Sequence, residues 1–211
     1  MKRLLATLLV AVALATARAA SQAAPPVRVA VLVDNGFLVG AAVNSIRQGL
    51  QMLVDGLPSS DEILLATIAG QMRIRQAPTT DRQKLRDAIG TIFVDQRSGT
   101  KLVDSVMEVD ERFLKKANLA AGFIVIVTTD GPETSADRTE EVNRWIREIA
   151  QRGVVVHAIL LSHLEGRGNE PQICMALTRS TGGRYEAIGA ITALPDKLGA
   201  IASMIGQHPP R

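Results

Sequence analysis

Polar residues that could do chemistry stand at the ends of apolar segments of this chain. Asp34 follows the first apolar run after residue 26, Asp130 follows the most apolar one, and Thr100 lies between them. Carboxylates and hydroxyls are the ligands that a hard divalent cation such as Mg²⁺ accepts. Carboxylates at strand ends also serve as catalytic groups or as helix caps, so the elements around these residues decide between three roles.

The segments that position these residues alternate between strand and helix patterns. Strand-like runs occupy residues 27–33, 62–70, 71–77, 122–129, 154–161 and 183–188. Amphipathic stretches typical of helices lie at 39–54, 81–92, 102–114, 137–151, about 170–180 and 192–205. This order predicts an α/β domain: a doubly wound, mostly parallel six-stranded sheet with one antiparallel hairpin strand and helices on both faces.

The carboxyl ends of parallel strands share one edge of a sheet, where ligands bind at a switch in strand order. Three polar loops are therefore expected to meet at that edge: Asp34-Asn35, Ser98-Gly99-Thr100 and Thr129-Asp130-Gly131. Their combination is more specific than any one of them, because a cation needs oxygen ligands from several directions.

The first nineteen residues differ from the rest of the chain. Lys2 and Arg3 precede an apolar run over residues 4–14, and Ala17 and Ala19 form a small-x-small cleavage pattern. This layout is typical of a secretory signal peptide, and the apolar run is shorter than the roughly 20 residues that a spanning helix needs. We therefore predict an exported protein, periplasmic or secreted, with no stable membrane insertion after cleavage. The predicted organisation is a signal peptide at 1–19, a short linker at 20–26, one domain at 27–206 and a tail at 207–211.

Cleavage would also change the charge of the chain. The full sequence has 24 Lys+Arg and 21 Asp+Glu, a net charge of +3, and residues 1–19 hold three basic and no acidic residues. The remaining chain then has 21 residues of each sign, which gives no support to a nucleic-acid partner. Cys174 is the only cysteine, so an intramolecular disulfide is impossible, and its apolar neighbours predict a buried thiol.

Five stretches occur in a characteristic order along the chain. They are the apolar strand ending in Asp34, SGTKLVDSV at 98–106, IVIVTTDG at 124–131, a helix followed by GVVVHAILL at 153–161, and TGGRYEAI at 181–188 before a closing helix. Together they resemble the von Willebrand factor type A (VWFA) domains over residues 27 to about 206. The resemblance implies a Rossmann-like VWFA fold. It also implies a metal-ion-dependent adhesion site, in which Mg²⁺ lies on three loops and an acidic group of a partner completes its coordination.

The metal ligands that this resemblance implies are incomplete. The family pattern in the first loop is D-x-S-x-S; Asp34 matches its aspartate, whereas Gly36 and Leu38 stand at the serine positions. Thr100 matches the threonine of the second loop and Asp130 the aspartate of the third, which leaves Asp34, Thr100 and Asp130 as the implied metal ligands. Mg²⁺ requires near-octahedral oxygen coordination, so the loss of two hydroxyls predicts a degenerate site with no cofactor or a weakly bound Mg²⁺.

Each of these residues also has a role that needs no metal. Asp34 or Asn35 is a candidate cap for the helix that follows them, and Thr100 for its own helix. Asp130 is a candidate to close a turn with Gly131. Two nearby carboxylates without a cation repel each other, which raises one pKa or separates the loops. We then expect Asp34 to accept hydrogen bonds from backbone N–H groups or from Thr100.

These features predict binding of a protein partner at the carboxyl edge of the sheet, without catalysis. The predicted binding residues are Asp34, Asn35, Gly36, Phe37, Leu38, Thr100, Asp130 and Gly131. Glu165, Arg167 and Asn169 in the loop 162–172 have two interpretations, a solvated connection or a further contact with the partner. The sequence identifies neither the partner nor the oligomeric state.

An exported hydrolase or transferase that uses the same loops is the alternative. Ser98 would be its nucleophile, but no histidine is an evident partner for it. His157 lies in a strand run, His163 in the following loop and His208 in the tail. The sequence also lacks a G-x-x-x-x-G-K-[ST] phosphate-binding pattern, so a nucleotide site has no support.

Overall fold

The computed structural model describes residues 27–96, 99–117, 121–135, 138–162 and 168–207. Within these ranges, six strands form one sheet in the order β3-β2-β1-β4-β5-β6. The strands are β1 Arg28–Val33, β2 Glu62–Thr67, β3 Arg73–Thr79, β4 Gly122–Thr129, β5 Val155–Leu161 and β6 Tyr185–Ile188. Neighbouring strands are parallel except β2 and β3, which form the antiparallel hairpin. The predicted sheet architecture is confirmed.

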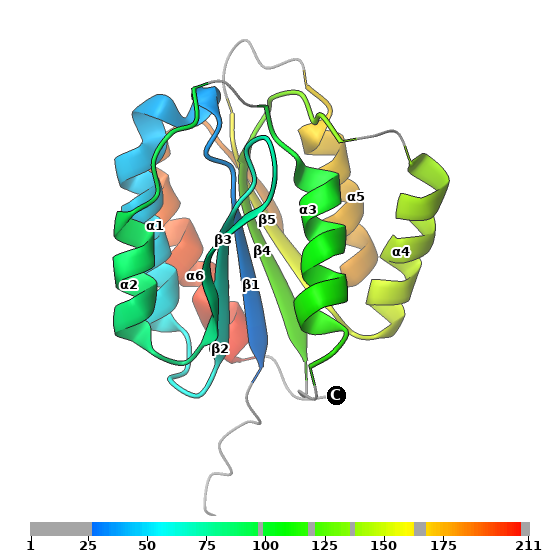
Figure 1. Cartoon of the computed structure of the whole chain (residues 1–211), viewed down its shortest axis with the longest axis horizontal. Helices are drawn as coiled ribbons and strands as arrows, with labels where there is room; N and C mark the ends of the chain where they lie inside the picture. The colour runs from blue at the N-terminus through cyan, green and yellow to red at the C-terminus, as the bar shows by residue number, and fades with distance from the viewer. Residues whose placement is uncertain (1–26, 97–98, 118–120, 136–137, 163–167, 208–211) are drawn as a thin grey trace, which may run out of the picture.

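Helices cover both faces of this sheet (Figure 1). They are α1 Val43–Gly56, α2 Arg82–Gly90, α3 Leu102–Val109, α4 Thr139–Gln151, α5 Glu170–Thr181 and α6 Leu194–Gly206. One face carries α1, α2 and α6, and the other carries α3, α4 and α5 (Figure 1). The 3-10 helices η1 Phe37–Ala42 and η3 Ile191–Ala193 precede α1 and α6.

The central strands are buried on both faces, which explains their mostly apolar sequences. In β1, Val29, Val31 and Val33 pack with the layer of α1, α2 and α6. Ala30 and Leu32 pack with the opposite layer. Successive side chains of a strand point to opposite faces, so both sets must be apolar where helices cover both sides.

The segment predicted as one helix over residues 102–114 changes its winding near the middle. The α-helical part ends at Val109, and Asp110–Leu114 forms a π-helical turn, η2. The wider turn places Leu114 in the core, while Phe113 is only partly buried. The simple helical period of 3.6 residues does not anticipate this change of phase.

The Asp110 carboxylate links the π-helical turn to α4. It is buried, and it accepts hydrogen bonds from Trp145 Nε1 (2.9 Å) and from the Arg152 guanidinium (2.5 Å). A buried charge is tolerated when an opposite charge and hydrogen bonds accompany it. Asp110 and Arg152 therefore form an ion pair that joins two helices of one layer.

Two sequence predictions concern single features outside the sheet. Cys174 is fully buried on α5, as predicted, and burial raises the pKa of its thiol. No helix in the described ranges has the length and apolar character needed to span a bilayer. The predicted signal peptide and linker, residues 1–26, lie outside those ranges.

Candidate functional site

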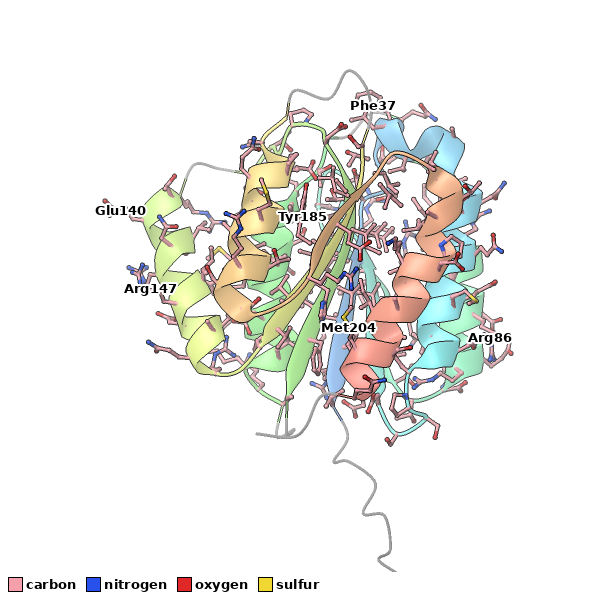
Figure 2. The ribbon with its side chains drawn as sticks, turned by 180° about the vertical axis from the view of Figure 1, so that it is seen from behind. Phe37, Arg86, Glu140, Arg147, Tyr185 and Met204 are labelled. Atoms are coloured by element: carbon pink, nitrogen blue, oxygen red, sulfur yellow. The ribbon has the colours of Figure 1, made fainter. Side chains whose placement is uncertain are left out.

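The candidate site lies where the strand order switches, at the carboxyl ends of β1 and β4. The chain moves from β1 to β2 on one side of the switch and from β4 to β5 on the other. Asp34 follows β1, and the Thr129 hydroxyl at the end of β4 donates to Asp34 Oδ2 (3.3 Å). Phe37, at the top of the molecule in Figure 2, marks the same edge. The structure therefore brings the first and third predicted loops into contact.

Asp34 is buried, and groups of the protein hold its carboxylate. Oδ1 accepts a hydrogen bond from the Gly36 N–H (2.7 Å). The expected backbone hydrogen bond is thus present, but the hydroxyl partner is Thr129 rather than Thr100. Gly36 is the N-cap residue of η1, which has no side-chain cap, so the prediction that Asp34 caps the following helix is wrong.

Asn35 attaches two other segments to the end of β1. Its Oδ1 accepts from the Ala69 N–H (3.2 Å), and its Nδ2 donates to the Phe93 carbonyl (2.9 Å). Its own carbonyl accepts from the Asp95 N–H (2.7 Å). Asn35 therefore holds the segments after β2 and α2 beside the first loop, and it does not cap the helix that follows it.

Phe37 faces solvent, whereas Leu38 packs into the site. Phe37 exposes 53% of its surface, whereas Leu38 is partly buried. A Cβ atom placed on Gly131 would lie 2.8 Å from Leu38 Cδ1, so the Leu38 side chain lies against Gly131. An apolar side chain from the first loop thus covers the third loop.

Thr100 joins the second loop to its neighbours through the backbone. It forms single β-bridges with Ala69 and with Glu133. α3 begins two residues later, and there the Val103 N–H donates to Glu133 Oε1 (3.3 Å). The Glu133 side chain, two residues after the third loop, therefore accepts an N–H at the start of α3. The N-cap residue of this helix, Lys101, provides no side-chain cap. The prediction that Thr100 caps this helix is wrong.

Asp130 is tied to the segment that follows β5. The Ser162 hydroxyl donates to Asp130 Oδ2 (3.3 Å), and the Gly168 N–H donates to the Asp130 carbonyl (3.0 Å). The turn at Gly131 is closed by Thr129, whose hydroxyl accepts from the Gly131 N–H (3.3 Å). Asp130 therefore does not close that turn as predicted, and its side chain faces Ser162 instead.

The described residues of the loop 162–172 contact the site directly. Asn169 Oδ1 accepts a hydrogen bond from the Glu133 N–H, two residues after the third loop (3.0 Å). Gly168 approaches Gly131 so closely that a Cβ on Gly168 would lie 1.6 Å from the Gly131 carbonyl oxygen, a contact that only glycine allows. Glu165 and Arg167 lie outside the described residues.

A buried carboxyl that the sequence did not single out lies beneath these loops. Glu170, the first residue of α5, is fully buried, and the Thr128 hydroxyl donates to its Oε2. Its Oε1 has no hydrogen-bond partner among the described residues. Burial raises the pKa of this carboxyl to about 8; the nearby Asp34 adds to the rise, while the hydroxyls of Thr128 and Thr100 oppose it. This rise belongs to a carboxyl outside the predicted pair Asp34 and Asp130, and burial is its largest cause.

The sequence carries only a weak signal for Glu170. An acidic residue followed by proline at the start of a helix is an ordinary pattern, because both suit the first helical turn. Such an acid is usually exposed. Its burial follows from the packing of α5 against β4 and β5, which the local sequence does not reveal.

The described residues fit a hydrated divalent cation poorly. The cavity between the three loops is lined by Asp34, Gly36, Phe37, Leu38, Gly99, Thr100, Gly131 and Pro132. Its volume is about 10 Å³, whereas a single water needs roughly 10–15 Å³ and Mg²⁺ usually keeps several waters. Across the described ranges, no cluster of three or more His, Cys, Asp or Glu side chains is placed to hold a metal ion.

His157, the histidine within the described ranges, has a structural role. It is buried in β5, its Nδ1 accepts from the Arg184 N–H (3.1 Å), and its ring stacks on Phe123 with the centroids 6.3 Å apart. Ser98, His163 and His208 lie outside the described residues. The catalytic alternative therefore stays an untested prediction.

Comparisons with known proteins identify the fold. No protein-family model and no curated protein matches the sequence. Among solved structures, a von Willebrand factor type A protein from Catenulispora acidiphila is similar with a TM-score of 0.68 at 12% identity. The conserved hypothetical protein BatB from Bacteroides thetaiotaomicron is similar with a TM-score of 0.64 at 17% identity. An aerotolerance-related membrane protein from Bacteroides fragilis has a TM-score of 0.63 at 16% identity.

The matched regions include most of this chain. The three similarities cover 85%, 85% and 84% of it, in the same order. They cover 98% of BatB and 99% of the Bacteroides fragilis protein, but the chain spans only 42% of the Catenulispora protein. Identities this low show the fold alone. The Rossmann-like VWFA fold expected from the sequence is confirmed.

Proposed function

We propose that this chain is an exported, non-catalytic VWFA-like domain that binds a protein partner at the carboxyl edge of its sheet, with an impaired or absent Mg²⁺ site. One fold hosts many functions, so the fold limits the function without naming it. The support for the proposal comes from the residues that form this edge.

The observation that carries the proposal is the exposure of Phe37. The chain has only four Phe, one Trp and one Tyr, and two of the Phe, Phe37 and Phe93, each expose 53% of their surface. The Arg75 guanidinium lies over the Phe93 ring, 5.0 Å from its centroid, whereas Phe37 stands at the candidate site. The Phe37 ring stands beside Leu38 and Pro132 on the rim of the candidate site. Exposed aromatic side chains with apolar neighbours are typical anchors of protein interfaces.

A partner at this edge would meet protein groups rather than a metal ion. Leu38 covers Gly131, and the Asp34 carboxylate already accepts hydrogen bonds from within the protein. We therefore expect recognition through apolar contact and the backbone of the loops, with Mg²⁺ bound weakly or not at all. The Mg²⁺ bridge to an acidic partner group, which the family resemblance implies, would then be lost.

The leader-like sequence supports export. Residues 1–19 have the charge, apolar run and small residues of a signal peptide, and the similar Bacteroides fragilis protein is described as a membrane protein. Mass spectrometry of the protein recovered from cells tests the prediction. A mature chain that begins at Ala20 is expected, and recovery of only the intact chain from Met1 would contradict export by cleavage.

Capture of partners from envelope extracts tests the binding edge. The wild type is compared with Phe37→Asp and with a matched control, Met52→Asp, because Met52 has a similar exposure of 47% but lies on α1. Loss of an aromatic anchor costs about 2 kcal/mol or more of binding free energy, so Phe37→Asp should lose the partner and Met52→Asp should retain it. Equal capture by both variants, with circular dichroism showing both folded, would contradict the proposal.

A further inference from the structure

The carboxyl of Glu170 lies between the end of β4 and the third loop of the candidate site. The Thr128 hydroxyl, two residues before Asp130, donates to its Oε2. Its Oε1 lies 3.8 Å from the place of a Cβ atom on Gly131, in the third loop. Burial raises the pKa of this carboxyl, and the charge of Asp34 in the first loop adds to the rise. One side chain from α5 therefore contacts both the end of β4 and the turn of the third loop.

Packing alone does not account for an acid at this position. Glu170 is fully buried, and the ion pairs formed among the described residues do not include it. A buried acid without a cation costs stability, whereas an apolar side chain of similar size would fill the same space without that cost. The unpartnered Oε1 adds to this cost. These costs point to a role for the carboxyl in arranging the loops.

Leu38 packs against Gly131, in the turn of the third loop, on the side away from Glu170. A Cβ atom on Gly131 would lie 2.8 Å from Leu38 Cδ1 and 3.8 Å from Glu170 Oε1, so the two side chains flank Gly131. The cavity that remains between the loops has a volume of about 10 Å³. In a VWFA-type adhesion site a cation would join these loops, but in this chain its own atoms occupy the space between them.

We propose that Glu170 is the positioning residue of this edge and, together with Leu38, holds the third loop in place without a divalent cation, so that partner recognition does not depend on such cations. Its hydrogen bond with Thr128 and its contact with Gly131 would order the third loop from below, while Leu38 covers that loop from above. The ordering role stands on the contacts of Glu170, and the cation independence of recognition rests on the proposed function.

Amide hydrogen exchange measures the order of the loops without any partner. The N–H groups of Gly36 and Gly168 are suitable reporters because they donate to Asp34 and Asp130. Glu170→Gln keeps the size and the hydrogen-bonding capacity of the side chain, whereas Glu170→Met keeps the size alone. We expect Glu170→Gln to exchange like the wild type and Glu170→Met to exchange about tenfold faster at both reporters, equivalent to ~1.4 kcal/mol of local stability. Equal exchange in the two variants would overturn the inference, because packing would then explain Glu170.

Divalent cations provide the second readout. The Tm of the wild type in EDTA is expected to equal its Tm in millimolar Mg²⁺, since a bound cation would raise it. A higher Tm in Mg²⁺, or loss of the captured partner in EDTA, would overturn the inference and leave the proposed binding edge standing. Equal partner capture by Phe37→Asp and the wild type would instead contradict the proposed function, while the exchange rates of Gly36 and Gly168 still decide the role of Glu170.

Discussion

Asp110 and Glu170 are both buried acids, yet the protein accommodates them in opposite ways. Asp110 accepts hydrogen bonds from Trp145 and from the Arg152 guanidinium, so its charge has an opposite charge beside it. Glu170 accepts from the Thr128 hydroxyl, and its pKa is raised to about 8, which leaves it mostly uncharged at neutral pH. The first acid joins two helices and the second lies beneath the loops of the candidate site. Each acid has one oxygen without a hydrogen-bond partner among the described residues, so the two differ in the guanidinium beside Asp110 and the uncharged hydroxyl beside Glu170.

Among the substitutions, loss of the Asp110 ion pair should give the largest loss of stability. Arg152→Met leaves the buried Asp110 without its cation, and removal of one partner from a buried pair costs about 3–5 kcal/mol of unfolding free energy. The Arg152 side chain is 33% exposed, so we expect the lower end, ~3 kcal/mol. Urea unfolding measures it against Arg86→Met, whose exposed pair with Asp55 should be worth less than ~1 kcal/mol. Equal losses in the two variants would mean that Asp110 needs no cation.

The buried carboxyl of Glu170 should make the stability of the protein depend on pH. Its pKa rises from an ordinary value of 4.5 to about 8 on folding, so between these values the folded state binds a proton that the unfolded state releases. The free energy of unfolding should therefore fall as the pH rises through this window, by roughly 1.4 kcal/mol per pH unit at the steepest. Glu170→Gln should lack this contribution and gain stability relative to the wild type as the pH rises. Urea unfolding at several pH values measures both proteins. If the free energies of unfolding of the wild type and Glu170→Gln differ by the same amount across the window, the raised pKa is contradicted.

The smallest effect concerns the backbone contact beside Glu170. In Gly168→Ala, the new Cβ would lie 1.6 Å from the Gly131 carbonyl oxygen, so the two loops must separate and the hydrogen bond from Gly168 to Asp130 should weaken. Forced shifts of this kind cost about 1–3 kcal/mol. The control is Gly189→Ala, where nothing lies within 4 Å of the new Cβ and a change within ~0.5 kcal/mol is expected. Similar melting temperatures for the two variants would show that the edge tolerates separated loops.

The order of the strands and helices could be predicted because burial on two faces leaves a clear pattern. The run at residues 122–129 is apolar up to Val127 and ends in two threonines, and it forms β4 at Gly122–Thr129. A strand covered by helices on both sides needs apolar residues at every position, so local sequence is enough to locate it. The resemblance to VWFA domains then added the expected meeting of the three loops.

The partners of individual polar groups could not be predicted in the same way. The Asp34 carboxylate accepts the expected backbone N–H, from Gly36, but its hydroxyl partner is Thr129 rather than Thr100. At the start of α3, the Val103 N–H donates to the side chain of Glu133, which lies 30 positions away in the chain. In the sequence, Glu170 is an ordinary acid of the first helical turn, and only the packing of α5 against the sheet buries it. These partners come from other loops, and only the folded structure determines which groups are within reach.

Phe37 projects from a backbone that is ordered before any partner arrives. Its 3-10 helix begins directly after Gly36, whose N–H is bound to Asp34. Ordering a flexible backbone costs roughly 1–2 kcal/mol of conformational entropy per residue, and this loop would not incur that loss on association. A small contact area would then be enough to retain a partner, and differences in affinity between edge variants should appear mainly as differences in dissociation rate.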